Sequence, residues 1–498
     1  MFRKVLVANR GEIAIRVIRS LQELGVTAVA VASDPDLGAP HALAADEVRP
    51  IGPAPASKSY LRMDAIVQAA LDSGCEAVHP GYGFLSENAA FARACAGAGL
   101  TFIGPPAKAI EVMGSKIESR RAMEAAGVPV VPGYQEEGAG DADLVRAAKK
   151  LGFPIVIKPS AGGGGKGMRV VTGADALASA VDLCRSEARA AFGDDRVYLE
   201  RYLSRPRHVE IQVFGDAEGR VFHLGERECS VQRRHQKILE ETPSPAVDPE
   251  LRARMGEAAV DAARAVGYRN AGTVEFLLDE DGSFYFLEMN TRLQVEHPVT
   301  ELVYGVDLVA AQVLTAAGEP LRFDPALLQP RGHAIEARIY AEDPAEGFLP
   351  QAGRVLRLRN PARRPGIRLD SGLEEGHTVT VHYDPLLAKL IAWGETRAVA
   401  NNRLRTALAE TTLLGFPTNI DFLIDVLEIP AWKEGRLHTG FLEEHLPRWR
   451  PPGEPPTEAI ALAAEASAGP ALTAATGSRD GFPSPWTALG GWRPLEDR

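Results

Sequence analysis

The N-terminal part of the chain alternates short apolar runs with segments of helical periodicity. This alternation predicts a strand, a helix and a second strand over 4–8, 13–24 and 26–31. Apolar runs at 77–78 and 101–103 predict further strands. Strands that alternate with helices form an open parallel sheet, so residues 1–114 are predicted to be an N-terminal domain. Its first turn lacks the Gly-x-Gly-x-x-Gly pattern, which argues against dinucleotide binding.

The pattern changes again in the rest of the chain. Residues 115–330 are predicted to form a central domain, in which helices and strands alternate to about residue 203 and strands with period-two alternation follow. Residues 331–446 are predicted to form a C-terminal domain of strands followed by helices. From Pro447 the composition shifts to Pro, Ala and Gly, which predicts a linker and tail over 447–498. The expected fold class is α/β, with strand-rich segments that make it α+β overall.

The composition excludes several classes of protein. Of the 498 residues, 45% are hydrophobic and 24% are charged, which is typical of a globular enzyme. A formal charge of −11 argues against nucleic acid or an acidic membrane as a partner. The cysteines Cys75, Cys95, Cys184 and Cys229 have neither metal nor disulfide spacing. With no signal peptide and no apolar run of membrane-spanning length, a cytoplasmic location is expected.

The most informative segment is Glu288-Met-Asn-Thr-Arg-Leu-Gln-Val-Glu-His297. Its polar residues Glu288, Asn290, Arg292, Gln294 and Glu296 occupy alternate positions. In an extended backbone, all five side chains would point to one face. A half-solvated strand shows the same alternation, but the preceding apolar run at 284–287 indicates a strand that is buried on both sides. Carboxylate, amide and guanidinium groups together suit a divalent cation beside an oxyanion, which predicts the floor of an active site.

A glycine-rich loop at 161–168 follows a strand predicted over 155–158, which ends in Lys158. Four consecutive glycines let backbone N–H groups surround a phosphate, although flexible surface hairpins also contain glycine runs. The loop is not a Walker loop, because Gly167 rather than Ser or Thr follows Lys166. Lys158 beside the loop favours a nucleotide site that the loop closes as a lid.

Two glutamates, Glu275 and Glu288, flank a hairpin turn signal at 279–282. Pairing of the two flanking strands would bring both carboxylates to the same end of the hairpin, where Asn290 can join them. Such a sparse set of oxygen ligands suits Mg²⁺, and a buried acidic pair without a cation would be costly. An exposed charged hairpin is the alternative.

Two strand-like segments carry weaker indications of function. Over 207–214, His208 shares a face with Glu210 and Gln212, a pattern more typical of a solvated strand. Over 333–340, Arg338 shares a face with Glu336 and is suited to stabilising an oxyanion.

The charged run at 226–237 is interpreted as a surface loop, from which His235 and Lys237 could still contact an anion or a nucleotide. Cys229 in this run has no companion ligand and is interpreted as a packing residue. His297 precedes Pro298 and is interpreted as a structural histidine.

Four blocks of this sequence together resemble biotin carboxylase, the ATP-grasp component of acetyl-CoA, propionyl-CoA and related carboxylases. The blocks are Val7-Ala-Asn-Arg-Gly-Glu-Ile-Ala14, His79-Pro-Gly-Tyr-Gly-Phe-Leu-Ser-Glu-Asn88, Gln232-Arg-Arg-His-Gln-Lys237 and Glu288 to His297. The resemblance is colinear over roughly residues 1–446. It implies a parallel α/β N-terminal domain, an ATP-grasp region with a mobile lid at about 132–203, and a C-terminal α/β domain.

The resemblance also implies roles for individual residues. The ATP-binding set would be Lys116, Lys158, Gly164, Gly165, Glu200, Arg201, Leu203, His208, Gln232, His235, Glu275 and Glu288. Two Mg²⁺ or Mn²⁺ ions would be held by Glu275, Glu288 and Asn290. Bicarbonate would contact Lys237, Arg292, Gln294 and the Val295 backbone. The catalytic set would be Arg292, Lys237, Glu296 as the general base and Arg338, which would also bind biotin and stabilise its enolate.

The implied reaction is the first half-reaction of an acyl-CoA carboxylase, of the acetyl-CoA or propionyl-CoA type. MgATP would activate bicarbonate as carboxyphosphate, which would then carboxylate the ureido nitrogen of biotin. The sequence contains no Ala-Met-Lys-Met biotin attachment site, so the carrier is expected on another polypeptide or beyond residue 498. A carboxyltransferase partner and a homodimer or larger assembly are also implied.

One departure from the family pattern and two alternative functions qualify this interpretation. Arg201 stands where the family pattern leads us to expect lysine. A different ATP-grasp ligase, which makes an acyl phosphate for an amine acceptor, would use much of the same machinery. A non-catalytic protein that binds nucleotide for assembly or regulation is a third hypothesis.

Overall fold

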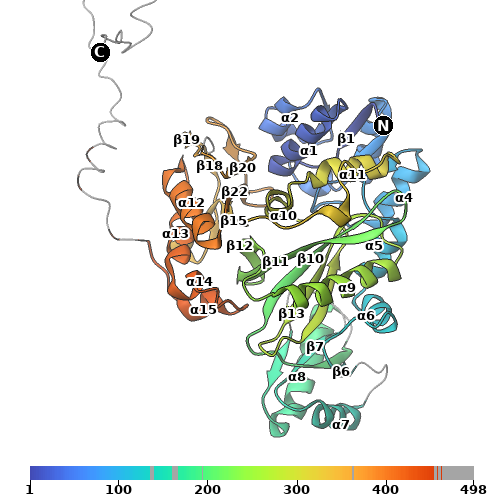
Figure 1. The fold of residues 1–498 in the computed structure, drawn as a ribbon, viewed down its shortest axis with the longest axis vertical. Helices are drawn as coiled ribbons and strands as arrows, with labels where there is room; N and C mark the ends of the chain where they lie inside the picture. The colour runs from blue at the N-terminus through green and yellow to red at the C-terminus, as the bar shows by residue number, and fades with distance from the viewer. Residues whose placement is uncertain are drawn as a thin grey trace, which may run out of the picture. The chain divides into compact units, whose positions relative to one another are not determined.

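The computed structural model describes residues 1–134, 140–159, 167–192, 195–361 and 364–451, with three isolated positions beyond these (453, 457 and 461). The chain divides into two units, Met1–Arg450 and Pro451–Arg498. The first unit contains all the helices and strands discussed below (Figure 1). The predicted tail lies almost wholly outside the described residues, as do Gly164 and Gly165 of the glycine-rich loop.

A five-stranded parallel sheet forms the N-terminal region. Its strands lie in the order β3-β2-β1-β4-β5, with bounds Glu47–Pro50, Thr27–Ala32, Lys4–Val7, Ala77–His79 and Thr101–Phe102. Helix α1 (Gly11–Glu23) places Ile13, Val17 and Leu21 at helical spacing, and all three are buried in one core with β1. The predicted parallel α/β arrangement is therefore confirmed.

A four-stranded antiparallel sheet follows in the chain. Its order is β6-β9-β7-β8, with bounds Gly133–Tyr134, Val197–Arg201, Ile155–Pro159 and Arg169–Val171. Helices α7 (Asp141–Leu151) and α8 (Leu177–Phe192) share a separate small core with these strands. The glycine-rich loop connects β7 to β8, at the end of the strand that carries Lys158.

The largest element is an eight-stranded antiparallel sheet. Its order is β14-β13-β10-β11-β12-β15-β22-β20. The strand bounds are Phe284–Asn290, Asn270–Leu278, Arg207–Gly215, Val221–Arg233, Gln236–Thr242, His333–Tyr340, Leu386–Gly394 and Ile367–Ser371. Helix α9 (Pro249–Ala265) packs on β10 and β11, and α12 (Arg397–Glu410) packs on β15 and β22 (Figure 1). Because one sheet joins the central and C-terminal regions, residues far apart in sequence meet on it.

The structure corrects two predictions about local structure. The charged run at 226–237 is not a surface loop: most of it belongs to β11 and β12, and Glu226, Arg227 and Glu228 are buried. Strand β14 ends at Asn290 and lies at the edge of the sheet, with Leu287 40% exposed. The expectations of a strand buried on both sides, and of one extended backbone through Glu296, are therefore wrong.

In the part of the chain that the structure describes, no single helix is long and apolar enough to cross a membrane. Helices α10 (His297–Tyr304) and α11 (Leu308–Ala316) together have the length and apolar composition of a membrane span, but the pair is bent by 95°.

Candidate active site

A row of charged residues crosses four strands of the large sheet. Arg227 on β11 lies opposite Glu210 on β10, which lies opposite Glu275 on β13, which lies opposite Glu288 on β14. Residues directly opposite each other on neighbouring strands share a face, so the register brings three carboxylates into one line. The predicted pairing of Glu275 with Glu288 across the 279–282 turn is confirmed.

Lys237 supplies the cation among these carboxylates. It is on β12, just after the β11–β12 turn, where Arg234 and His235 adopt positive φ angles of 49° and 67°. Its Nζ donates to Glu210 Oε2 at 2.6 Å, to Glu275 Oε1 at 2.8 Å and to Glu296 Oε1 at 2.8 Å. Its side chain is 11% exposed, so this ammonium group is surrounded by acceptors and little solvent.

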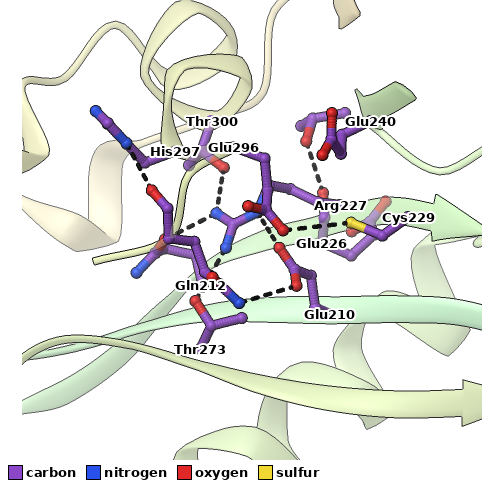
Figure 2. Close-up of polar contacts among 12 residues, drawn as sticks. Glu210, Gln212, Glu226, Arg227, Cys229, Glu240, Thr273, Glu296, His297 and Thr300 are labelled. Atoms are coloured by element: carbon purple, nitrogen blue, oxygen red, sulfur yellow. Dashed lines mark hydrogen bonds and ion pairs between the residues drawn. The ribbon is translucent and has the colours of Figure 1, made fainter. Parts of the chain in front are cut away.

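Arg227 anchors the cluster, and Figure 2 shows its guanidinium group among its acceptors. Its Nε donates to Glu210 Oε1 at 2.5 Å. The other donors reach Gln212 Oε1 at 2.7 Å, Thr300 Oγ1 at 3.0 Å and Thr273 Oγ1 at 2.9 Å. A buried charge is tolerated when it is paired and fully hydrogen-bonded, and Arg227 is 0% exposed. Glu210 is therefore held between two cations.

After β14 the chain turns instead of remaining extended, yet its polar side chains still converge. Arg292 Nη2 donates to Asn290 Oδ1 at 2.8 Å, and its Nη1 donates to Gln294 Oε1 at 2.5 Å. The Gln294 and Asn290 amides in turn donate to Glu275 Oε1, at 3.0 and 2.8 Å. These side chains therefore do meet at the row of carboxylates, as predicted, but a turn of the backbone brings them there instead of an extended strand.

Glu296 lies between two cations. Its Oε1 accepts from Lys237, and its Oε2 accepts from Arg338 Nη2 at 2.9 Å. Arg338 comes from β15 and also donates through Nε to Glu240 on β12. The face of 333–340 that carries Arg338 therefore meets the 288–296 segment, a relation that the sequence left open.

This environment controls the protonation of Glu296. Burial alone would raise its pKa, but Lys237 and Arg338, followed by Arg227, hold that pKa well below its usual range. Burial would likewise lower the pKa of Lys237, and the three carboxylates instead raise it well above its usual range. Glu296 is therefore ionised and Lys237 is charged near neutral pH.

Glu210 behaves differently from Glu275 on the neighbouring strand. Burial and then repulsion by Glu296 raise the pKa of Glu210. Burial would also raise the pKa of Glu275, but Lys237 and His208 hold it below its ordinary value. His208 Nε2 lies 2.7 Å from Glu275 Oε2, so the structure places this histidine beside the carboxylates.

The oxygen ligands predicted for a metal ion lie together. Glu275 and Glu288 face each other on adjacent strands, and Asn290 donates to Glu275. Glu288 is exposed, so its carboxylate can be reached from solvent. Carboxylate and amide oxygens with open access fit Mg²⁺, which retains water or phosphate oxygens in its shell. His208, Glu210 and Glu275 also have ligand atoms within 4.8 Å of one another.

The residues predicted on the nucleotide side occupy several elements. Lys158 on β7 forms an ion pair with the buried Glu200 on β9, which also accepts from Arg120 Nη1 at 2.9 Å. Lys116 is exposed at the first position of α6 (Lys116–Ala125). Arg201 pairs with Asp279 at 3.0 Å. Of the other residues predicted to bind ATP, Leu203 and Gln232 are buried, and His235 is exposed in the β11–β12 turn.

Sequence reasoning missed three residues of this site. The sequence pattern predicts a solvated strand at Glu210 and a surface loop at Arg227, although both residues are 0% exposed. Glu87 lies in the block at 79–88 and has no predicted role, yet its Oε2 accepts from Arg292 Nε at 2.9 Å. One signal in the sequence does point to Glu210: it is a polar residue that alternates with apolar residues along a long strand.

Two interpretations of individual residues agree with the geometry. Cys229 is buried with its Sγ 3.8 Å from Glu296 Oε1, and burial and then Glu210 raise its pKa well above the usual range (Figure 2). Such a thiol is protonated and unreactive, as expected for a packing residue. His297 is fully buried, with Nδ1 2.7 Å from the Gln294 carbonyl oxygen, which is a structural position.

Three family models match the chain in succession. Residues 1–110 match "Biotin carboxylase, N-terminal domain", residues 115–323 match "Carbamoyl-phosphate synthase L chain, ATP binding domain", and residues 336–444 match "Biotin carboxylase C-terminal domain".

Curated relatives are 50–52% identical to this chain over the residues that align. The alpha chain of mitochondrial methylcrotonoyl-CoA carboxylase from Oryza sativa is 52% identical over 445 residues, which cover 89% of this chain and 60% of that protein. A pyruvate carboxylase component of Methanothermobacter thermautotrophicus is 51% identical over 446 residues, which cover 89% and 90%. The chloroplastic biotin carboxylase of Arabidopsis thaliana is 50% identical over 442 residues, which cover 89% and 82%. The chain thus spans about 60% of the methylcrotonoyl-CoA carboxylase alpha chain that it matches.

Solved structures share the fold. The biotin carboxylase domain dimer of the Hydrogenobacter thermophilus 2-oxoglutarate carboxylase, in complex with MgADP, ADP and bicarbonate, has a TM-score of 0.82 at 46% identity and covers 89% of this chain and 98% of its own. The biotin carboxylase–β-γ-ATP complex from Campylobacter jejuni has a TM-score of 0.83 at 42% identity and covers 89% and 99%. The mixed α/β fold with a parallel N-terminal sheet and an ATP-grasp centre is thereby confirmed.

Proposed function

The chain belongs to the biotin carboxylase family, and we propose that it uses ATP and bicarbonate to carboxylate biotin on a carrier protein. One observation carries this proposal: the ionised Glu296 is buried between Lys237 and Arg338, at 2.8 and 2.9 Å. The Glu296 carboxylate can serve as a base, and it lies beside one cation for an anionic substrate and a second cation for a developing oxyanion.

Bicarbonate is proposed to bind at Lys237, Arg292, Gln294 and the Val295 backbone. Arg292 and Gln294 are already joined by a hydrogen bond of 2.5 Å, so their donors are positioned before substrate arrives. A planar guanidinium group matches the geometry of a carboxylate-like anion. Bicarbonate that takes hydrogen bonds from Lys237 weakens the hold of Lys237 on Glu296, which raises the proton affinity of that carboxylate.

In the proposed first step, Glu296 removes the bicarbonate proton and a bicarbonate oxygen attacks the γ-phosphorus of ATP. ADP leaves, and the product is carboxyphosphate. Glu275, Glu288 and Asn290 would hold divalent cations, Mg²⁺ or Mn²⁺, that neutralise phosphate charge. In the second step, carboxyphosphate gives up its carboxyl group to the ureido nitrogen of biotin, and inorganic phosphate leaves with the ureido proton. Arg338 would stabilise the enolate oxygen of the deprotonated biotin.

The nucleotide is proposed to lie along the small antiparallel sheet, under the glycine-rich loop. Lys116 and Lys158 would neutralise its phosphates, and Gly164 and Gly165, which lie outside the described residues, would close over them. The adenosine side would be lined by Glu200, Arg201, Leu203 and His208. His235 would lie near the phosphates, and Gln232 would also bind ATP. The ion pair between Lys158 and Glu200 keeps that lysine at the end of β7, beside the start of the loop.

The wider assignments are part of the same proposal. The domains are taken as 1–114, 115–330 with its lid at about 132–203, 331–446, and a linker and tail at 447–498. The enzyme would be a C–N forming ligase of the cytoplasm, would work with a biotin carrier and a carboxyltransferase, and would form a homodimer or larger assembly. An acetyl-CoA or propionyl-CoA acceptor is proposed, and the names of the relatives add methylcrotonoyl-CoA and pyruvate as acceptors to compare.

A second candidate is an ATP-grasp ligase that transfers the activated carboxyl group to a different amine. The match of residues 115–323 to a carbamoyl-phosphate synthase ATP-binding model favours it. The matches on both sides of that region are to biotin carboxylase models, which favours biotin as the acceptor. A non-catalytic nucleotide-binding protein would not need an ionised base between two cations.

Transfer of labelled carbon from bicarbonate to biotin distinguishes these candidates. The assay combines ¹⁴C-bicarbonate, ATP and Mg²⁺ with free biotin or with a biotinylated carrier domain, and it is repeated with Arg338→Gln. The proposal predicts ATP-dependent labelling of biotin that Arg338→Gln abolishes, with ATP binding retained. Labelling of an amine other than biotin would support the second candidate, and ATP binding without any transfer would support the third.

A further inference from the structure

A lysine outside the proposed substrate-binding residues contacts the backbone of the catalytic segment. Lys389 is on β22, opposite Arg338 of β15, and it is 0% exposed. Its Nζ donates to the Val295 carbonyl oxygen at 2.8 Å. That carbonyl belongs to the peptide group that joins Val295 to Glu296.

This peptide group has a central place in the proposed mechanism. On one side is Val295, whose backbone is proposed to contact bicarbonate, and on the other side is Glu296, the proposed base. The segment leaves β14 at Asn290 and begins α10 at His297, so between the two it has no strand or helix to fix it. Lys237 and Arg338 hold the Glu296 side chain, whereas Lys389 holds its backbone.

The charge on Lys389 is balanced by one residue of the N-terminal region and one residue of the neighbouring strand β20. Glu12 Oε1 of α1 lies 3.3 Å from its Nζ, and Asp370 Oδ2 of β20 lies 3.8 Å from it. Glu12 also accepts from the Tyr82 hydroxyl, and Asp370 accepts from Arg368 Nη2 at 2.8 Å. The N-terminal and C-terminal regions therefore meet at the lysine that supports the catalytic segment.

The close approach of these regions is built into the backbone. A Cβ atom at Gly372, just after β20, would lie 2.9 Å from the Glu12 backbone nitrogen, so only glycine fits there without displacement. Packing alone does not require an ammonium group at this point, because an apolar residue of similar volume would fill the space without desolvating a charge. What a lysine adds is a donor for a buried carbonyl group.

We propose that Lys389 is a positioning residue, which holds the Val295–Glu296 peptide in the orientation needed for bicarbonate binding and deprotonation. This inference rests on the proposed function. It extends the residues that determine bicarbonate affinity to a strand of the C-terminal region and to its partner Glu12 on the first helix.

The variant Lys389→Met removes the donor while keeping a side chain of similar length. The remaining acidic groups have other ways to avoid an unpaired charge. Asp370 retains Arg368. Burial raises the pKa of Glu12 to about 7, although the positive charge of Lys389 opposes this shift. Glu12 can therefore take up a proton when the lysine is removed. The variant is therefore expected to fold.

The expected result is a change in bicarbonate kinetics rather than in nucleotide binding. Loss of a hydrogen bond from a charged donor corresponds to a roughly tenfold to hundredfold effect, so the bicarbonate KM should rise by about that factor. The affinity for ADP should change by less than about twofold, because the nucleotide residues lie on other elements. A general loss of structure would move both quantities together.

Arg397→Met is the matched control. Arg397 is a partly buried cation that, like Lys389, pairs with a carboxylate and donates to a carbonyl group. Its carboxylate is that of Glu241, and its carbonyl belongs to Lys433, on α14 (Pro430–Lys433). The inference predicts a normal bicarbonate KM for Arg397→Met. Equal bicarbonate KM values for Lys389→Met, Arg397→Met and the wild type would overturn it.

Two further outcomes would also bear on the inference: a Lys389→Met variant that does not fold, and a wild type without activity. If Lys389→Met does not fold, Lys389→Arg keeps the charge but moves the donating atoms, and the inference predicts a raised bicarbonate KM with normal ADP affinity; an unchanged KM would refute it. An inactive wild type would overturn the proposed function and this inference with it. An active wild type with an unaffected Lys389→Met variant would overturn only the inference.

Discussion

Removal of the Lys237 ammonium group should destabilise the protein and create a new cation site. The variant Lys237→Met leaves three carboxylates, of Glu210, Glu275 and Glu296, that each lost a hydrogen bond of 2.6 to 2.8 Å. Glu210 still has Arg227, and Glu296 still has Arg338. Glu275 keeps the nearby His208 and its amide donors, so it loses the most charge compensation.

The magnitude follows from these contacts. At an effective dielectric constant near 20, each contact contributes roughly 6 kcal/mol of Coulomb energy before desolvation is subtracted. Measured losses after removal of one partner of a buried pair are about 3–5 kcal/mol. If the central region of about 200 residues melts as one unit, each kcal/mol corresponds to about 2–4 °C, so the melting temperature should fall by roughly 6–20 °C.

Thermal melting with and without MgCl₂ tests this reasoning, with Lys433→Met as the control. Lys433 pairs with Glu428 on the surface at 45% exposure, and such pairs contribute about 1 kcal/mol or less. Three carboxylates that have each lost the cation they shared suit a hard divalent cation, so Mg²⁺ should stabilise Lys237→Met more than it stabilises the wild type. A melting temperature equal to that of Lys433→Met, with no extra response to Mg²⁺, would refute the reasoning.

Three further predictions concern single residues. Glu336 is 0% exposed on β15, opposite Glu240, and neither of its carboxyl oxygens has a hydrogen-bond partner among the described residues, while burial raises its pKa well above the usual range. A carboxyl group whose pKa is raised by folding contributes stability below its unfolded pKa of about 4.3, and this stability is lost as pH rises through the folded pKa. In paired melting curves, the stability of Glu336→Gln relative to the wild type should therefore increase from pH 5 to pH 8. A stability difference that stays constant over this range would contradict the prediction. Glu87→Gln removes the charge that faces Arg292 at 2.9 Å, and because Glu87 is exposed the bicarbonate KM should rise by no more than about fivefold in steady-state kinetics; an unchanged KM would show that Glu87 does not orient Arg292. Arg201→Lys keeps a cation near Asp279 at a position 40% exposed, so the ATP KM should change by less than about twofold, and a larger change would indicate that the guanidinium shape matters there.

Much of the fold could be predicted because local patterns decide it. The βαβ start of the chain has apolar runs and a helix with one buried face, and both signals depend only on neighbouring residues. The hairpin that pairs Glu275 with Glu288 was predictable for the same reason, since its turn signal lies between the two strands.

The site was less predictable where distant strands meet. The sequence alone gives no reason to place Arg227 beside Glu210, because the register between β10 and β11 decides that contact. Charged runs are usually solvated, and the run at 226–237 is an exception because distant residues neutralise its charges. Glu210 of β10 pairs with Arg227 and Lys237, and Arg252 of α9 pairs with Glu226. The turn after Asn290 was missed because alternation predicts an extended strand, whereas side-chain bonds to Glu275 stabilise a bent path.

ADP release measured with and without bicarbonate and free biotin, for the wild type and for Glu296→Gln, tests the central claim most directly. Glu296→Gln keeps the shape of the side chain but cannot act as the base, and loss of a general base lowers turnover by about 10²–10⁴-fold. The account predicts bicarbonate-dependent turnover that biotin stimulates in the wild type and that Glu296→Gln loses while ATP still binds. Turnover that is indifferent to biotin, or that survives in Glu296→Gln, would contradict it.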